Sequence, residues 1–485
     1  MTKIKQFAMI GLTALLIINN TFLCFANEDT DAPADSSALD AGKTIEVETN
    51  NISGWPQGPI IGADSAILMD ADSGVILYQK NINAKEYPAS ITKILTCLVA
   101  AENCSMDEMV TFSNEAVFGI DKGSSNVGMD VGQSITMEEA IYCIMLESAN
   151  EVAAAVAEHV SGSVDSFVAL MNKRAKELGC TGTHFANANG LPNEDHWTTA
   201  HDMALIAQAF NSNESLRHIA STNNYDIHAT STQPDSFTMS NHHKMYPGKK
   251  YAYEYVTWGK TGYTNVARET LVTCAEKDGM NLICVIMKEE PPYQYTDTRE
   301  LLEYGFNNFK KSYIADNETS YDIGNADFFQ TDEDIFGSSK AILSLNPDGY
   351  IILPNNASFS DAKSSISYDG IDKNSVAKIC YTFNGDYVGS TTVDVADNDV
   401  QTFAFGAAVS ADTAPVSSNS FTNNKNVVFV NIKKILIAAG IIAGILLIVF
   451  IIRSILKNFN FSSRRRRNIK RRNRRYHSEF DHFDF

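Results

Sequence analysis

The sequence is poor in cysteine, and the cysteines that it has are scattered. None of the eight stands in a C-x-x-C pair, and Cys24 falls in an N-terminal segment that we expect to be removed. The odd, unpatterned set of seven that is left argues against a disulfide framework and against a zinc site. Most of the seven lie in apolar runs, as Cys97 and Cys284 do, so buried free thiols are expected. We expect no metal and no cofactor.

Basic residues are scarce along most of the chain. Residues 27–424 hold 23 Lys and Arg against 55 Asp and Glu, a net charge of −32, whereas the whole chain has −19. A surface of this charge is poorly suited to binding a polyanion, which excludes nucleic acid as an expected partner. Net charge bears on solubility and steering, and it does not identify a substrate.

Charge is absent from one long stretch near each end of the chain. The N-terminal stretch, 7–18, follows Lys3 and Lys5 and precedes Cys24-Phe25-Ala26, so residues 1–26 predict a secretory signal peptide. The second stretch, residues 435–452, has 18 residues without a charge and predicts one transmembrane helix.

The residues around the predicted helix fix its orientation. Eleven cations follow it in the tail 453–485, against three just before it, so we expect this tail to be cytoplasmic and the rest of the chain to lie outside. A basic run could also bind nucleic acid. Its position directly behind a predicted span instead favours a role in setting the membrane orientation and in contacting membrane lipid. The expected location is the cell membrane, with a single pass.

Residues 58–312 predict an α+β domain. Hairpin patterns lie near its two ends, around Asp72-Ser73-Gly74 and around Lys277-Asp278-Gly279. Strands at both ends that enclose helices imply one sheet assembled from both ends of the domain. Apolar periodicity predicts the helices over 91–102, 137–146, 151–160, 164–178, 199–210 and 298–309.

The remaining segments differ in composition. Residues 27–57 are polar, lack apolar periodicity and predict a flexible leader. Residues 318–398 alternate apolar and polar positions between Asn-Pro-Asp-Gly and Asn-Gly-Asp turns, which predicts a small all-β domain. Residues 399–434 predict a stalk, since most of them are Ser, Asn, Ala and Thr.

The segment Ser90-Ile-Thr-Lys93 pairs a hydroxyl with an amine one helical turn away. Serine alone is a weak nucleophile, and a desolvated neutral lysine is one of the groups that can activate it. The pattern by itself is weak, because it recurs at 360–363, 375–378 and 454–457. Those copies fall in the predicted β domain and beside the predicted span.

Two further motifs follow. Ser148-Ala-Asn150 lies between two predicted helices, but its form also occurs at 124–126, 221–223 and 417–419. Lys260-Thr261-Gly262 occurs once, just before the second hairpin. A cation, a hydroxyl and a glycine at a strand edge are suited to holding a carboxylate while substrate backbone lies close.

The order of the three motifs is more informative than any one of them. They are separated by 58 and 112 residues, and with them the chain resembles the D-alanyl-D-alanine carboxypeptidases, the low-molecular-weight penicillin-binding proteins. The likeness covers about 58–310 and includes Phe185-Ala-Asn-Ala-Asn-Gly-Leu191. It implies a β-lactamase/transpeptidase-like domain, with an antiparallel sheet and a helical cluster, followed by an accessory β domain.

The resemblance also implies roles for the residues of the first two motifs. Ser90 would attack the penultimate D-alanyl carbonyl of a peptidoglycan stem peptide, and Lys93 would take its proton. Ser148 would relay a proton to the departing D-alanine, and Asn150 would hold the substrate amide. The enzyme would then be a serine carboxypeptidase, with β-lactam antibiotics as acylating inhibitors.

The third motif would bind the substrate, by the same resemblance. Lys260 and Thr261 would hold the terminal carboxylate, and Gly262 would let the substrate backbone lie close. The backbone N–H groups of Ser90 and Tyr263 would form an oxyanion hole, in which each donor contributes about 3 to 4 kcal/mol.

Other functions stay open at this point. A β-lactamase would need a base for deacylation, and no Glu-x-x-Leu-Asn segment lies between Asn150 and Lys260. Endopeptidase action on cross-links and an inactive wall-binding protein are further alternatives. His242-His243 lacks a third ligand at metal spacing, and His201-Asp202 is more consistent with a helix start than with a catalytic triad. Arg268 has no assigned role, nor has the tail segment 479–485.

Overall fold

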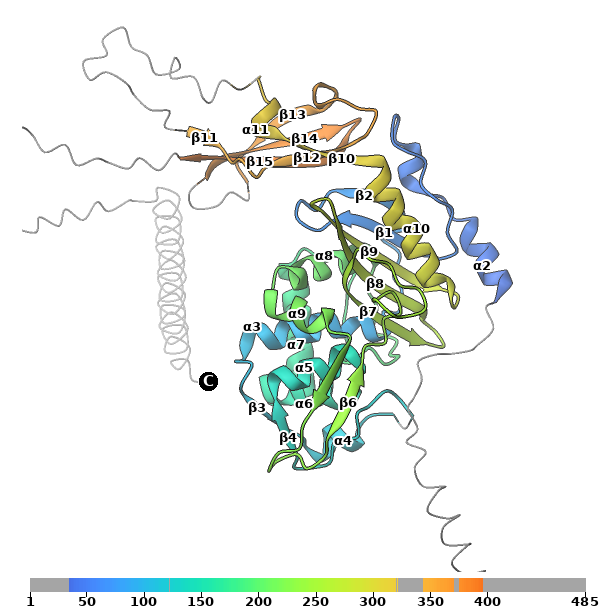
Figure 1. Cartoon of the computed structure of the whole chain (residues 1–485), viewed down its shortest axis with the longest axis vertical. Helices are drawn as coiled ribbons and strands as arrows, with labels where there is room; N and C mark the ends of the chain where they lie inside the picture. Colours follow the sequence, from blue (N-terminus) through green and yellow to red (C-terminus); the bar gives the residue numbers. More distant parts are fainter. Residues whose placement is uncertain (1–34, 122, 320, 322–342, 370–374, 396–485) are drawn as a thin grey trace, which may run out of the picture. The chain divides into compact units, whose positions relative to one another are not determined.

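The computed structural model describes residues 35–121, 123–319, 321, 343–369 and 375–395, which all belong to one compact unit (Figure 1). In this part of the chain, no helix combines the length and apolarity that crossing a bilayer requires. Four of the predicted segments lie outside the described residues: 1–26, 399–434, 435–452 and 453–485.

The central feature is a five-stranded antiparallel sheet with the order β2-β1-β9-β8-β7. The first two strands come from the start of the domain and the other three from its end, as the two hairpin patterns predicted. β7 forms one edge of the sheet. The strands are β1 (Ser65–Asp70), β2 (Ile76–Lys80), β7 (Val256–Thr264), β8 (Arg268–Lys277) and β9 (Met280–Glu289).

The helices between the hairpins form a cluster on one face of this sheet (Figure 1). Their bounds lie within two residues of the predicted ones, and a capping box of Thr136 and Glu139 begins one of them. The long helices are α3 (Lys93–Asn103), α5 (Met137–Leu146), α6 (Asn150–Ser161), α7 (Val164–Glu177) and α8 (Ala200–Asn211). Shorter elements are η2 (Ala89–Thr92), α4 (Asn114–Phe118), α9 (Glu214–Ser221), β3 (Met109–Thr111), β4 (Ser134–Thr136), β5 (Asn224–Ile227) and β6 (Phe237–Ser240).

The sheet separates two apolar cores because successive side chains of a strand point to opposite faces. In β1, Ile67 and Met69 pack among the helices of the cluster. Leu68 packs in the second core with residues of α10 (Tyr293–Asn308), which covers the other face (Figure 1). A Cβ on Gly305 of α10 would lie 2.7 Å from Leu68, so this glycine lets the helix approach the sheet closely.

The segment before the sheet corrects the flexible leader expected over 27–57. From residue 35 onward it contains α2 (Ser36–Lys43) and η1 (Glu48–Asn51). Trp55 is buried, and its indole N–H donates to the Leu77 carbonyl oxygen at 2.9 Å. The few apolar residues of this segment are too widely spaced to show a period, yet they anchor it to the second core.

A second antiparallel sheet follows α10, in agreement with the predicted all-β domain. It has six strands in the order β10-β12-β15-β14-β13, with β11 paired to β15. One boundary differs, because β10 (Phe309–Tyr313) begins within the range 58–312 assigned to the first domain but pairs with β12. The other elements are α11 (Ile314–Asn317), β11 (Leu343–Leu345), β12 (Tyr350–Pro354), η4 (Phe359–Asp361), β13 (Lys363–Ser367), β14 (Ser375–Phe383) and β15 (Asp386–Val395).

Candidate active site

Ser90 and Lys93 meet as the helical spacing predicts. Ser90 lies in η2 and is partly exposed, whereas Lys93 begins α3 and is completely buried. The Lys93 Nζ donates to Ser90 Oγ at 3.0 Å. Ser90 is therefore partly accessible to solvent, whereas its amine partner is shielded from water.

The backbone before Ser90 is strained. Ala89 has a φ of +50°, a region that residues with a Cβ rarely occupy. The Thr270 hydroxyl of β8 donates to the Pro88 carbonyl oxygen at 2.8 Å and holds this turn. Gly190 packs on its other side, where a Cβ would lie 1.9 Å from the Ala89 carbonyl oxygen. The surrounding contacts thus fix the position of Ser90.

The second motif shares the Lys93 amine with the first. Asn150 begins α6, and its Oδ1 accepts from Lys93 Nζ at 2.7 Å. Ser148 precedes it in the α5–α6 loop with a φ of +59° and no solvent exposure. Among the described residues, its Oγ has no hydrogen-bond partner. A buried, unpaired hydroxyl on a strained backbone is typical of a functional position.

Two residues that the sequence analysis left without a role complete the surroundings of Lys93. The carbonyl oxygen of Asn189 accepts from Lys93 Nζ at 2.6 Å. The His196 Nε2 lies 2.9 Å from Thr92 Oγ1, and its Nδ1 accepts from the Ala186 N–H at 3.0 Å. Burial lowers the pKa of His196 to about 4, so the imidazole is neutral near pH 7.

The third motif lies on β7, at the edge of the sheet and next to Ser90. A Cβ on Gly262 would lie 2.8 Å from the Ser90 backbone nitrogen, so only a glycine fits this approach without displacement. Lys260 is 1% exposed, and its Nζ donates to the Thr261 carbonyl oxygen at 3.0 Å. Tyr263 continues the strand beside them and is partly exposed.

The two pairs considered above, His242-His243 and His201-Asp202, make contacts that support the fold. His243 is buried, and its Nε2 lies 2.8 Å from Thr273 Oγ1; burial, and then the Lys260 charge, lower its pKa to about 3. His242 Nε2 lies 3.0 Å from Glu147 Oε2. The Asp202 carboxylate accepts from the Gly182 N–H at 2.7 Å and from the Thr183 hydroxyl at 2.7 Å, and so ties the 181–183 segment to α8.

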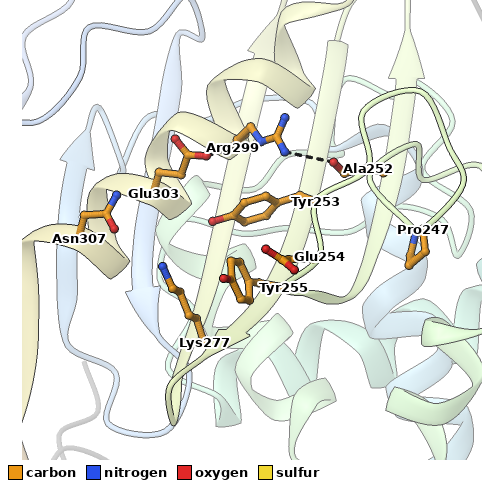
Figure 2. A pocket seen from close by; sticks show the side chains of 9 residues that line it. All are labelled: Pro247, Ala252, Tyr253, Glu254, Tyr255, Lys277, Arg299, Glu303 and Asn307. Atoms are coloured by element: carbon orange, nitrogen blue, oxygen red, sulfur yellow. Dashed lines mark hydrogen bonds and ion pairs between the residues drawn. The ribbon is translucent and has the colours of Figure 1, made fainter.

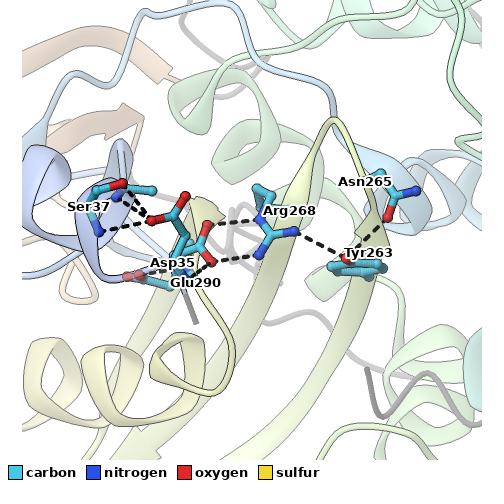
Figure 3. A network of polar contacts seen from close by, with 8 residues as sticks. Asp35, Ser37, Tyr263, Asn265, Arg268 and Glu290 are labelled. Atoms are coloured by element: carbon cyan, nitrogen blue, oxygen red, sulfur yellow. Dashed lines mark hydrogen bonds and ion pairs between the residues drawn. The ribbon is translucent and has the colours of Figure 1, made fainter. Parts of the chain in front are cut away.

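Arg268 is held at the tip of the β7–β8 hairpin (Figure 3). Its guanidinium donates to both carboxylate oxygens of Glu290, at 2.8 and 2.6 Å, and to the Tyr263 hydroxyl at 3.2 Å. The Asp35 backbone N–H donates to the same carboxylate at 2.9 Å. The hydrogen bond from Arg268 lowers the pKa of Glu290. Arg268 therefore anchors the strand end that carries Tyr263.

A hollow of about 560 Å³ lies away from these motifs (Figure 2). Cations already cover two of its aromatic rings, since Arg299 stands 5.0 Å above Tyr253 and Lys277 stands 5.0 Å above Tyr255. None of the motif residues lines it, so it does not belong to the candidate active site. Its lining consists of Pro247, Ala252, Tyr253, Glu254, Tyr255, Lys277, Arg299, Glu303 and Asn307.

Sequence comparisons relate the chain to known proteins. A family model described as D-alanyl-D-alanine carboxypeptidase matches residues 54–290, a range that contains all three motifs. The carboxypeptidase DacF of Bacillus subtilis is 34% identical over 257 residues, which cover 51% of this chain and 63% of DacF. DacA of Escherichia coli K12 is 30% identical over 320 residues, which cover 62% of this chain and 72% of DacA.

A solved structure matches a larger share of the chain. Penicillin binding protein 5 of Haemophilus influenzae superposes with a TM-score of 0.55 at 26% identity, covering 70% of this chain and 98% of that chain. Both the sequence match and the fold therefore include the motif-bearing domain. The chain belongs to the D-alanyl-D-alanine carboxypeptidase family of serine hydrolases.

Proposed function

We propose that this enzyme removes the terminal D-alanine of peptidoglycan stem peptides through an acyl-enzyme on Ser90. The observation that carries the proposal is the position of the Lys93 amine, 3.0 Å from Ser90 Oγ and 2.7 Å from Asn150 Oδ1. One buried amine thus joins the nucleophile to the second motif, and the Gly262 edge of β7 runs directly beside the Ser90 N–H.

Acylation begins with the attack of Ser90 Oγ on the carbonyl carbon of the penultimate D-alanine. The neutral amine of Lys93 accepts the hydroxyl proton, and the oxygen becomes a competent nucleophile. The carbonyl oxygen takes up negative charge, which the N–H groups of Ser90 and Tyr263 stabilise as an oxyanion hole. The rigid turn at Ala89 keeps the first of these donors in place.

The C–N bond then breaks, and the leaving amine needs a proton. Ser148 passes the proton from Lys93 to the amine nitrogen, which gives its unpaired buried hydroxyl a partner when substrate is bound and leaves Lys93 neutral. Water then attacks the resulting ester, Lys93 accepts a proton from the water, and this proton passes to Ser90 Oγ as the ester bond breaks. The products are free D-alanine and a stem peptide that is one residue shorter.

The other motif residues bind the substrate on either side of the scissile bond. The Asn150 side-chain amide holds the peptide amide of the substrate, and Lys260 and Thr261 hold its terminal carboxylate. The near-absence of solvent exposure at Lys260 strengthens this charge pairing. A β-lactam presents an amide and a carboxylate with similar spacing, so penicillin should acylate the same serine.

The test is acylation and product analysis with the full chain in detergent. Penicillin should leave one adduct, which peptide mapping should place on Ser90, and a peptide ending in D-Ala-D-Ala should release D-alanine. Lys93→Ala should lose both activities and keep its fold. The matched controls are Ser360→Ala in η4 and Lys363→Ala at the start of β13, an exposed Ser-x-x-Lys pair that should have no role.

Other outcomes of the same test would point elsewhere. Rapid turnover of the β-lactam without D-alanine release would indicate a β-lactamase, and cleaved cross-links in purified peptidoglycan would indicate an endopeptidase. An adduct on a serine other than Ser90, or near wild-type acylation by Lys93→Ala, would end the assignment. The absence of any adduct would favour an inactive wall-binding protein.

We also propose that the enzyme is tethered to the cell membrane. The support is the uncharged stretch 435–452 and the eleven cations behind it, which place the tail 453–485 in the cytoplasm by the positive-inside rule. The catalytic domain would then be extracellular, where peptidoglycan is found. Anionic lipid at the inner surface would be the partner of the basic tail.

A further inference from the structure

A second group of reactive side chains lies at the far ends of two helices that carry active-site residues. α3 begins with Lys93, and Cys104 caps its C-terminal end. α6 begins with Asn150, and His159 lies in its last turn. Glu108 stands between them in sequence, directly before β3. All three side chains are partly or fully exposed and are not used by the proposed reaction.

The three side chains converge on one point. One ligand atom from each of Cys104, Glu108 and His159 lies within 4.8 Å of the other two. His159 Nε2 is 3.0 Å from Glu108 Oε2. The other carboxylate oxygen, Oε1, accepts from the Ser105 backbone N–H at 2.7 Å, which orients the carboxylate toward the cluster.

The chemistry of these groups matches one class of ligand. Thiolate, imidazole and carboxylate are the side chains that bind Zn²⁺, at bond lengths of about 2.0 to 2.3 Å. Tetrahedral coordination places such atoms about 3.3 to 3.6 Å apart, so small side-chain rotations would close the site. An ion pair accounts for the contact between His159 and Glu108. Burial, the Glu108 charge and a hydrogen bond to Glu108 raise the pKa of the Cys104 thiol, so the same carboxylate contacts both of the other side chains.

We propose that Cys104, Glu108 and His159 bind a Zn²⁺ ion, with a water molecule as the fourth ligand. On binding, the Cys104 S–H bond breaks, the sulfur binds the metal and the proton passes to solvent. The hydrogen bond between Glu108 and His159 is replaced by two bonds to the ion. The metal ties the end of α3 to the end of α6 and so stabilises the helices that position Lys93 and Asn150.

The sequence alone does not predict this site, because its three residues come together only in the folded chain. Cys104 and Glu108 are four residues apart, but His159 follows Glu108 by 51 residues and Cys104 lies outside any C-x-x-C pair, so no single motif marks the three as ligands. Only the packing of α3 against α6 brings them together. The inference depends on these side chains alone and stands or falls independently of the proposed function.

The probe for this site is Co²⁺, which replaces Zn²⁺ and reports thiolate ligation by its absorption. The full chain in detergent, reduced and freed of metal by a chelator, is titrated with Co²⁺ and then with Zn²⁺. We expect the protein to bind one equivalent of Co²⁺ and to show a sulfur-to-cobalt charge-transfer band in the near ultraviolet. This band should disappear when Zn²⁺ is added. Zn²⁺ should also raise the Tm of the apo protein.

Variants locate the ligands. Cys104→Ser should abolish the charge-transfer band, and His159→Gln should weaken Co²⁺ binding by about 100-fold or more, since even the loss of supporting contacts costs about 10- to 100-fold. The matched control is Cys180→Ser, which removes another partly buried thiol and should bind like wild type. The proposal fails if saturating Co²⁺ gives no band, or if Cys104→Ser keeps it. It also fails if Zn²⁺ shifts the Tm of wild type and Cys104→Ser equally.

Discussion

Ser148 combines two features that cost stability. Its buried Oγ has no hydrogen-bond partner in the described part of the chain, and its φ of +59° is unfavourable for a residue with a Cβ. Each feature costs about 1 to 3 kcal/mol. The folded enzyme tolerates them because the loop is held by α5 and α6 on both sides. The Ser148 hydroxyl therefore does not stabilise the fold, and a role in the reaction explains why it is present.

We predict that Ser148→Ala lowers penicillin acylation and D-alanine release by about 100-fold or more, because a proton-transfer group is lost. Its Tm should stay the same or rise, since an unpaired buried hydroxyl is removed. Ser65→Ala is the control, because Ser65 is a buried β1 residue whose Oγ also lacks a partner. Equal activity loss in both variants, or a large drop in Tm for Ser148→Ala alone, would contradict the role.

The buried His196 gives a prediction about pH. Burial lowers its pKa to about 4 from an ordinary 6.5. Between these values the unfolded chain binds a proton that the folded chain does not, so the free energy of unfolding rises with pH across this window and is lost in acid. Urea unfolding at several pH values should show this slope.

The variant His196→Gln should flatten that slope, whereas His218→Gln, at an exposed position, should leave it unchanged. An unaltered slope in His196→Gln would assign the acid sensitivity to other groups, such as the buried His243.

At the residue scale, the sequence predicted which motifs share a site but not what supports them. Ser90 and Lys93 are three residues apart, so a single helical turn brings them together. The contact between Lys93 and the Asn189 carbonyl spans 96 residues and involves backbone, so the quoted segment 185–191 marked Asn189 without predicting this contact. The Thr270 hydroxyl reaches Pro88 across 182 residues in the same way. These supporting contacts depend on tertiary packing.

At the element scale, the segment before β1 is the clearest departure from expectation. Trp55 is 5% exposed and packs against Phe309 of β10, with ring centroids 5.0 Å apart. A single large side chain can anchor a segment that has no apolar period, and periodicity is what the leader prediction relied on. The same pattern did succeed for the hairpins and for the helices between them, whereas α10 begins at Tyr293, five residues before the predicted start at 298.

We predict that Trp55→Ala destabilises the protein by about 3 to 5 kcal/mol, the usual cost of truncating a buried large aromatic side chain. Ile60→Ala is the control, because Ile60 lies in the same stretch and is 67% exposed. Thermal and urea unfolding measure the change in the free energy of unfolding for both variants. A loss below about 1 kcal/mol for Trp55→Ala would restore the flexible leader of the sequence analysis.

At the scale of the whole molecule, charge distribution and function have to agree. Residues 27–424 carry −32, whereas the eleven cations of the tail follow the uncharged stretch 435–452. Under the proposed function the catalytic domain acts outside the cell, and the positive-inside rule independently predicts a tail inside it. The stalk predicted over 399–434 would give it a reach of about 30 Å as a flexible chain.

We therefore predict that truncation before Lys425 releases a soluble protein into the medium that penicillin acylates as fully as the full chain, because the membrane segment is lost and all three motifs are kept. In intact cells without an outer barrier, added protease should remove the ectodomain of the full-length enzyme and leave a fragment that contains the basic tail. Immunodetection of tags at residue 27 and at the C-terminus shows whether each end of the chain survives digestion. Cells permeabilised before digestion are the control. A protected ectodomain with a digested tail would reverse the orientation, and the catalytic domain would then face away from its proposed substrate.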